Sequence, residues 1–198
     1  MTYTIIIFLF ISLALVVLIW LRKIQFDAVH RNFLDLVDHY GGKVQRGGFA
    51  IRPRFSGEYQ GFPVSISISS ERKKKDQSRQ FYISIYFKSP ANFNFTVLSR
   101  DWLKGRNEAE TNKRTFAEIV EKKYRLEGSN INIRKNLEIT TIEDIIKNIH
   151  PIAYVLVSKK GMILERISTN LIKDTEFGAL NKLLEGLWKL SQLSAKEE

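Results

Sequence analysis

The feature that most constrains this chain of 198 residues is an uncharged apolar run from Thr4 to Leu21. An α-helix rises about 1.5 Å per residue, so a run of this length crosses a hydrocarbon layer roughly 30 Å thick. The rest of the chain is polar, basic and free of cysteine. We therefore predict a transmembrane anchor at residues 1–23, which holds a soluble domain, residues 24–198, against a membrane.

A cleaved signal peptide is the alternative interpretation of this run. Signal peptides start with positive charge and end at small residues. Here Met1–Tyr3 has no basic side chain, and Ile19–Arg22 has no pair of small residues. The run therefore favours a retained anchor. Trp20, Arg22 and Lys23 at its end are typical of a membrane interface, where aromatic rings and long cationic side chains gather.

Basic side chains follow the span and none precede it. The positive-inside bias then places the N-terminus outside and the C-terminal domain in the cytoplasm. Few charges carry this bias, so the opposite topology stays open. The lack of cysteine fits a reducing compartment without requiring one.

The net charge of +10 is unevenly distributed. Residues 22–114 contain 18 basic and 9 acidic side chains, whereas residues 115–198 contain 13 and 12. A basic half next to a membrane span fits contact with anionic lipid, to which each nearby Lys or Arg contributes about 1 kcal/mol. A solvated basic surface explains the same excess. Nucleic acid is a third possible partner, but no nucleic-acid motif supports it.

The first half of the domain predicts one helix followed by strands. Apolar residues recur at three- and four-residue steps over 24–40, which indicates a helix continuous with the span, and Gly41-Gly42 would end it. Residues 64–69 and 81–88 alternate apolar with polar side chains, the pattern of half-buried strands. We therefore expect an antiparallel β-meander.

The second half predicts mainly helices. Capping boxes at Thr115–Glu118 and Thr140–Glu143 predict helices over 116–126 and 142–149. Two apolar runs that flank Ser158–Gly161 predict a hairpin, and the spacing over 177–193 predicts a long amphipathic helix. The expected fold class is α+β: a transmembrane helix, an antiparallel β-meander, helices, a β-hairpin and a C-terminal amphipathic helix. A sub-boundary is possible near 107–114.

The densest cationic run lies between the two predicted strands of the meander. Its members, with the nearby arginine, are the candidate anion-binding residues: Arg72, Lys73, Lys74, Lys75 and Arg79. A hairpin tip is exposed, so these side chains could meet the phosphates of lipid headgroups or of nucleic acid. A merely solvated tip is the alternative. Trp102, in a charged turn, is expected to fill the edge of the core rather than to cap a binding groove.

The chain resembles a loose class of bacterial membrane-anchored domains of unknown function. The resemblance is carried by hydrophobic spacings and glycines in Gly57–Val64, Phe116–Leu126 and Phe177–Leu193. It implies a bacterial inner membrane as the location and assigns no catalytic residue.

No sequence motif for catalysis is present: there is no nucleophile elbow, phosphate-binding loop, zinc-protease motif or dinucleotide fingerprint. The absence of cysteine excludes thiolate chemistry, and three scattered histidines argue against a zinc site. We expect no catalytic residue, no metal and no cofactor.

Three functions of different classes remain. The leading hypothesis is a non-catalytic, membrane-tethered module that binds a membrane or cytoplasmic protein, with its basic half against the lipid bilayer. An anion-binding module that uses residues 72–79 is the first alternative. An enzyme of unrecognised type is the second. Nucleic acid is not the expected partner.

Overall fold

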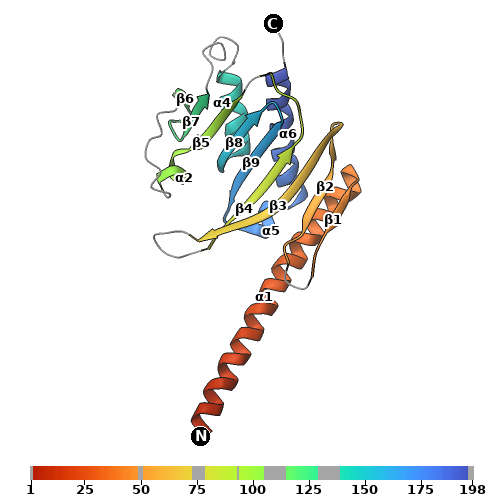
Figure 1. Cartoon of the computed structure of the whole chain (residues 1–198), viewed down its shortest axis with the longest axis vertical. Helices are drawn as coiled ribbons and strands as arrows, with labels where there is room; N and C mark the ends of the chain where they lie inside the picture. The colour runs from red at the N-terminus through yellow and green to blue at the C-terminus, as the bar shows by residue number, and fades with distance from the viewer. Residues whose placement is uncertain are drawn as a thin grey trace.

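A computed structural model describes residues 2–48, 51–72, 79–92, 94–104, 115–128 and 139–195. The fold is α+β, as predicted, with one long N-terminal helix, an antiparallel sheet of nine described strands, and further helices (Figure 1).

Helix α1 (Thr2–Tyr40) joins the apolar run to the folded domain without a break. Its 39 residues span about 58 Å at the usual rise. The N-terminal part is exposed along its length and is long and apolar enough to cross a membrane. The C-terminal part is amphipathic and buries Phe26, Val29, Phe33 and Leu36. Gly41, at a φ of 68°, ends the helix as predicted.

The strands form one sheet in the order β1-β2-β3-β4-β9-β8-β5-β7-β6. Every neighbouring pair is antiparallel. The strands are β1 (Lys43–Gln45), β2 (Arg54–Tyr59), β3 (Phe62–Arg72), β4 (Arg79–Phe87), β5 (Phe95–Ser99), β6 (Thr115–Ile119), β7 (Tyr124–Gly128), β8 (Ile152–Ser158) and β9 (Gly161–Ser168).

The predicted hairpin at 152–167 is confirmed, but its position is central. β9 pairs with β4 and β8 pairs with β5, so the hairpin joins the first four strands to β5–β7. This arrangement places residues from both halves of the chain in one hydrophobic core. The possible sub-boundary near 107–114 falls outside the described residues and stays a prediction.

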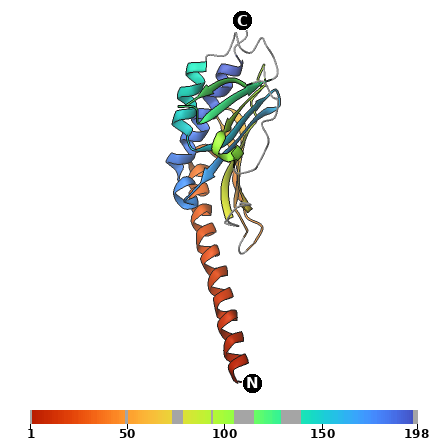
Figure 2. The ribbon, with the colours of Figure 1, turned by 90° about the vertical axis from the view of Figure 1, so that its left-hand side faces the viewer.

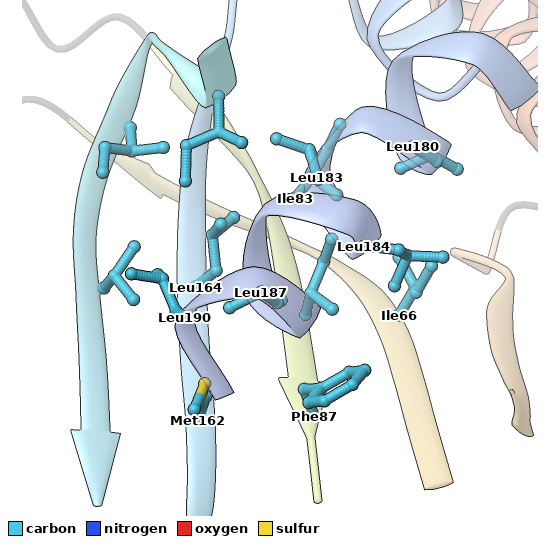
Figure 3. Packing of buried hydrophobic residues seen from close by; sticks show 14 of the residues in the cluster. Ile66, Ile83, Phe87, Met162, Leu164, Leu180, Leu183, Leu184, Leu187 and Leu190 are labelled. Atoms are coloured by element: carbon cyan, nitrogen blue, oxygen red, sulfur yellow. The ribbon is translucent and has the colours of Figure 1, made fainter. Parts of the chain in front are cut away.

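Helices cover one face of the sheet (Figure 2). They are the C-terminal part of α1, α4 (Ile139–Ile149), α5 (Leu171–Asp174) and α6 (Phe177–Ala195). α6 lies over the middle of the sheet and packs its leucines against inward-facing strand residues (Figure 3). These residues include Ile66, Ile83, Phe87, Met162 and Leu164 on the strands and Leu180, Leu183, Leu184, Leu187 and Leu190 on the helix.

The helix predicted over 116–126 is wrong. The segment forms the hairpin β6–β7, with Val120, Glu121 and Lys122 at φ values of 52°, 53° and 63° in its turn. Tyr124 and Leu126 are buried at strand spacing, and Leu126 lies opposite Val97 of β5. A capping box is worth only about 1 kcal/mol to a helix. Pairing with the edge of β5, together with two buried side chains, outweighs this local preference.

Candidate binding surface on the open sheet face

The face of the sheet away from α1, α4, α5 and α6 carries an unusual share of apolar and aromatic side chains. An antiparallel sheet with one solvated face normally has polar residues there. In this sheet the side chains that point away from the core include Tyr86, Leu98, Tyr154, Leu156, Ile163 and Ile167, all of them half-buried or exposed. We call this surface the open face.

Strand pairing brings the open-face residues together from distant parts of the chain. Ser67 lies opposite Ser84, and Ser84 lies opposite Glu165. Glu165 in turn lies opposite Tyr154, which lies opposite Leu98. This single row crosses five strands. Because β8 and β9 enter the middle of the sheet, the row cannot be read from any one stretch of sequence.

A hollow of about 310 Å³ opens on this face. Two serines of β3, Ser69 and Ser70, are part of its lining. The residues that line it are Ser69, Ser70, Glu71, Tyr82, Trp102, Tyr154 and Glu165. Glu165 accepts a hydrogen bond of 2.6 Å from the Ser84 hydroxyl, which orients its carboxylate.

Trp102 comes from the short helix α2 (Arg100–Lys104), which follows β5 directly. The Arg100 guanidinium forms an ion pair with Glu118, and the Arg100 backbone N–H donates to the Lys123 carbonyl at 3.0 Å. These contacts tie α2 to the β6–β7 hairpin. The Trp102 ring lies 5.4 Å from the Tyr154 ring, between centroids, with the planes tilted by 51°. Trp102 is half-buried beside the hollow and outside the core cluster, so the prediction that it fills a core edge is wrong.

The predicted cationic tip lies mostly outside the described residues, because Lys73, Lys74 and Lys75 fall in the gap from 73 to 78. The structure places Arg72 and Arg79 directly opposite each other at the end of β3–β4. This end of the sheet lies toward the apolar part of α1 (Figure 1).

A further arginine, Arg52, interacts electrostatically with Arg79. Burial lowers the pKa of Arg52, and the charges of Arg22 and Arg79 lower it further. The Arg52 guanidinium donates to the Ile68 carbonyl at 3.3 Å and lies 5.9 Å above the Phe81 ring, so it lies beside the end of β3–β4. Arg22 also lies 5.5 Å above the Phe26 ring, and Lys23 pairs with Asp27 at 2.9 Å, whereas Trp20 is exposed on α1. Arg52 was not predicted as a site residue, because it lies well before the cationic run in the chain.

Among the residues that the structure describes, no group of three or more His, Asp or Glu side chains lies close enough to hold a metal ion.

Comparison with known proteins gives a fold relationship. No protein-family model matches the chain, and no curated protein matches its sequence. Among solved structures, the chain is similar to the crystal structure of the mycobacterial trehalose monomycolate transport factor A, TtfA. The TM-score is 0.54, and the match covers 83% of this chain and 93% of TtfA. The two proteins share a fold. At 11% sequence identity, the similarity carries no information about ligand or partner.

The sequence does contain a signal for the open face. The segment from Ile152 to Val157 is apolar at outward as well as inward positions, and Met162–Leu164 is similar. Such runs are typical of strands covered on both faces. In this sheet the described helices α1, α4, α5 and α6 cover only one, and the outward side chains of the same runs, Tyr154, Leu156 and Ile163, are half-buried on the other.

Proposed function

We propose that this chain is a non-catalytic, membrane-tethered module that binds a protein partner on its open face. One observation supports the proposal most directly. The described helices α1, α4, α5 and α6 cover one face of the sheet, and the other face is rich in apolar and aromatic side chains. Accessible apolar surface that gathers on one face of a soluble domain marks an interaction site. On this face Tyr86 is exposed, and Leu98, Leu156, Ile163 and Ile167 are half-buried.

The tether supports this role because it holds the domain close to the bilayer. Only four residues separate Leu21, the end of the apolar run, from Phe26, the first core residue. At the rise of a helix this is about 8 Å. α1 is further fixed to the domain by the Tyr40 hydroxyl, which donates to Asn181 at 2.6 Å, and by the Asn32 amide, which donates to the Ile172 carbonyl at 2.8 Å.

The proposed location is the bacterial inner membrane, with the domain on the cytoplasmic side. The basic residues that follow the span favour this orientation. The similarity to TtfA, described as a transport factor for trehalose monomycolate, fits a membrane setting but does not select a cargo or a partner.

Co-purification tests the proposal. The intact chain is extracted from its native membranes in mild detergent, and bound proteins are quantified. We expect a near-stoichiometric protein partner that is lost in the Tyr86→Ser/Ile163→Ser variant, because these two residues lie opposite each other on the open face. The matched control is Leu34→Ser/Ile172→Ser, which removes two exposed apolar side chains on the helix side. Equal retention of the partner by both variants would contradict the proposal.

Anion binding at the membrane-proximal end is a second candidate function. Like charges directly opposite each other in a ladder destabilise the pair, and Arg72 and Arg79 have this arrangement. A phosphate-bearing lipid headgroup between them would relieve the repulsion. The proposed set is Arg72 and Arg79 with Lys73, Lys74 and Lys75, joined by Arg22 and Arg52.

Lipid retention tests this second candidate. Anionic phospholipid that stays bound to the detergent-purified chain is counted by mass spectrometry at low and high salt. We expect Arg72→Ser/Arg79→Ser to retain less anionic lipid than the wild type, and we expect salt to have the same effect. Lys182→Ser/Lys189→Ser removes the same charge from α6 and serves as the control. Equal lipid loss in both variants would contradict a defined site.

A further inference from the structure

The loop between β1 and β2 lies at the membrane end of the domain. After α1 ends at Tyr40, β1 runs back beside this helix (Figure 1). Arg46, the first residue after β1, forms an ion pair with Asp27 of α1. Asp27 lies six residues beyond Leu21, the end of the apolar run, which is about 9 Å at the rise of a helix. Since the headgroup region adds about 5–7 Å to each side of the hydrocarbon core, the loop starts at the outer edge of the headgroups.

Two arginines hold the described part of this loop in place. Arg46 is 17% exposed and is paired with α1. At the other end of the loop, the Arg52 guanidinium donates to the Ile68 carbonyl and to the Ser70 hydroxyl, and it lies above the Phe81 ring. These contacts join the loop to the anchor helix on one side and to β3 and β4 on the other. The position of the loop relative to the membrane is therefore set by the fold.

Ile51 is an exposed apolar side chain on this loop. It is 51% exposed, whereas Pro53, two residues later, is buried. The Ile51 side chain lies over Gly47 and Gly48, where an added Cβ atom would come within 3.4 Å of Ile51 Cδ1 at either glycine. The side chain thus contacts its own loop and is not a member of the core cluster. A single exposed apolar side chain is common on soluble domains, so its position decides what Ile51 does.

The pattern of charge around Ile51 fits a membrane interface. Residues 47–51 carry no charge, and an arginine flanks them on each side. At an interface, long cationic side chains stay among the headgroups while apolar side chains enter the boundary of the acyl chains. Burial of an exposed isoleucine side chain in that boundary is favourable, because it removes apolar surface from water.

We propose that Ile51 inserts into the headgroup–acyl boundary of the leaflet that α1 leaves, which makes the β1–β2 loop a second membrane contact of the domain. The contact is apolar, so it differs from the anion binding proposed for Arg72 and Arg79. It depends on the membrane tether and not on a protein partner. A second contact at the β1 edge of the sheet holds the domain at a fixed tilt, and so holds the open face at a fixed angle to the bilayer.

Spin-label accessibility of the full-length chain in vesicles tests the contact. The chain has no cysteine, so a nitroxide on one introduced cysteine reports one position. Ile51→Cys is compared with Leu18→Cys, inside the apolar run, and with Leu34→Cys, which is 42% exposed on α1. Leu34 lies about 20 Å beyond the end of the apolar run at the rise of a helix. The vesicles contain phosphatidylcholine and phosphatidylglycerol in equal amounts.

Two relaxing agents distinguish lipid from water. Oxygen concentrates among the acyl chains, whereas a nickel chelate stays in water. We expect the label at position 51 to collide more often with oxygen than with the chelate, as at position 18, and the label at position 34 to show the reverse. A label at position 51 that is as accessible to the chelate as the label at position 34 would overturn the insertion.

Vesicles of phosphatidylcholine alone separate insertion from attraction between charges. An apolar contact needs no anionic lipid and resists added salt, which screens exposed charges. The label at position 51 should therefore stay in contact with lipid in these vesicles and at high salt. A label that reaches lipid only when phosphatidylglycerol is present at low salt would assign the contact to charge and overturn the insertion of Ile51.

A label beside Ile51 tests the isoleucine itself. The nitroxide is placed at Gly47→Cys, next to the Ile51 side chain. We expect Ile51→Ser to lower the ratio of oxygen to nickel collisions at this label toward the value at position 34. Ile172→Ser removes an isoleucine of α5 that is 37% exposed and should leave the ratio unchanged. No decrease with Ile51→Ser, or an equal decrease with both variants, would overturn the role of Ile51.

The inference and the proposed function fail in different ways. If the label at position 51 stays in water while Tyr86→Ser/Ile163→Ser still loses a protein partner, the loop contact is wrong and the open-face module stands. If the label lies in lipid but no protein partner depends on Tyr86 and Ile163, the loop contact stands and the protein-binding open face is overturned.

Discussion

Gly186 of α6 lies so close to Ile149 of α4 that a Cβ atom added to the glycine would come within 2.5 Å of Ile149 Cγ2. The close approach lets the two helices meet beside the core, where Ile145 and Leu187 are also buried. Gly178, in the first turn of α6, differs from Gly186: among the described residues no atom lies within 4 Å of its added Cβ. The two glycines of one helix therefore serve different purposes.

Alanine substitutions at the two positions should have opposite effects. We expect Gly186→Ala to lower the free energy of unfolding by about 1–2 kcal/mol, because overpacking costs about 1–3 kcal/mol and exceeds the gain in helix propensity. Gly178→Ala should raise the free energy of unfolding by up to about 1 kcal/mol. Urea unfolding of the chain in micelles measures both. The same sign at both positions would contradict the close contact.

The Arg166–Asp174 pair should be important for stability. The two side chains are 15% and 17% exposed and lie 3.2 Å apart. Asp174 also accepts from the Ser168 hydroxyl at 2.8 Å, and Arg166 donates to the Ile149 carbonyl at 3.3 Å. Removing one partner leaves a largely buried charge behind, so we expect Asp174→Ala to destabilise the fold by about 2–4 kcal/mol.

The Lys189–Glu185 pair is the matched control for this prediction. Its side chains are 48% and 47% exposed at a distance of 2.7 Å. Exposed pairs of this kind contribute about 0–1 kcal/mol, so Glu185→Ala should change stability by less than about 1 kcal/mol. Similar losses in Asp174→Ala and Glu185→Ala, by urea unfolding, would show that burial does not decide the strength of these pairs.

The local elements of the fold were largely predictable from the sequence. The amphipathic pattern over 24–40, the alternation in β3 and β4, and the helix over 177–193 each depend on residues close in sequence. The β6–β7 hairpin was not predicted because its stability depends on β5 and on Glu143 of α4. The Glu143 carboxylate, expected to cap its own helix, accepts instead from the Val120 backbone N–H at 2.8 Å.

The candidate site was much less predictable than the elements. The hollow assembles Glu71, Tyr82, Trp102, Tyr154 and Glu165, which are separated by long stretches of chain. They meet only because β8–β9 enters the sheet between β4 and β5. No local pattern specifies that position, since it is decided by how the two halves bury their apolar faces together.

The contact between Glu143 and the β6–β7 turn gives a further prediction. Val120, Glu121 and Lys122 occupy the left-handed region, where side chains other than glycine are strained. We expect Glu143→Ala to lower the free energy of unfolding by about 1–2 kcal/mol, because a charge-assisted hydrogen bond to the turn is lost. Asp144→Ala, on the exposed side of α4, is the control. A loss in the control as large as that in Glu143→Ala, measured by urea unfolding, would argue against the turn contact.

Stability should decrease as the pH falls below about 6.5, the ordinary pKa of histidine. Burial lowers the pKa of His150, and the charges of Lys123 and Arg166 lower it further. The Tyr124 hydroxyl lies 2.5 Å from His150 Nδ1. Between the lowered pKa and pH 6.5, the unfolded chain binds a proton that the folded chain does not. The free energy of unfolding therefore decreases as the pH is lowered through this range.

Paired variants isolate the contribution of His150 to this dependence. Urea unfolding at pH 7.5 and 5.5 should show a smaller pH effect in His150→Gln than in the wild type. His39→Gln, on α1, should keep the wild-type effect. A pH effect that His150→Gln leaves unchanged would assign the dependence to other groups.

Site-specific photocrosslinking in native membranes tests the central claim most directly. A benzoylphenylalanine is placed at Tyr86 on the open face or at Leu34 on α1, two positions that are 41% and 42% exposed. We expect a discrete protein adduct at position 86 and none at position 34. Adducts with lipid alone at position 86, or the same protein adducts at both positions, would contradict a protein-binding open face.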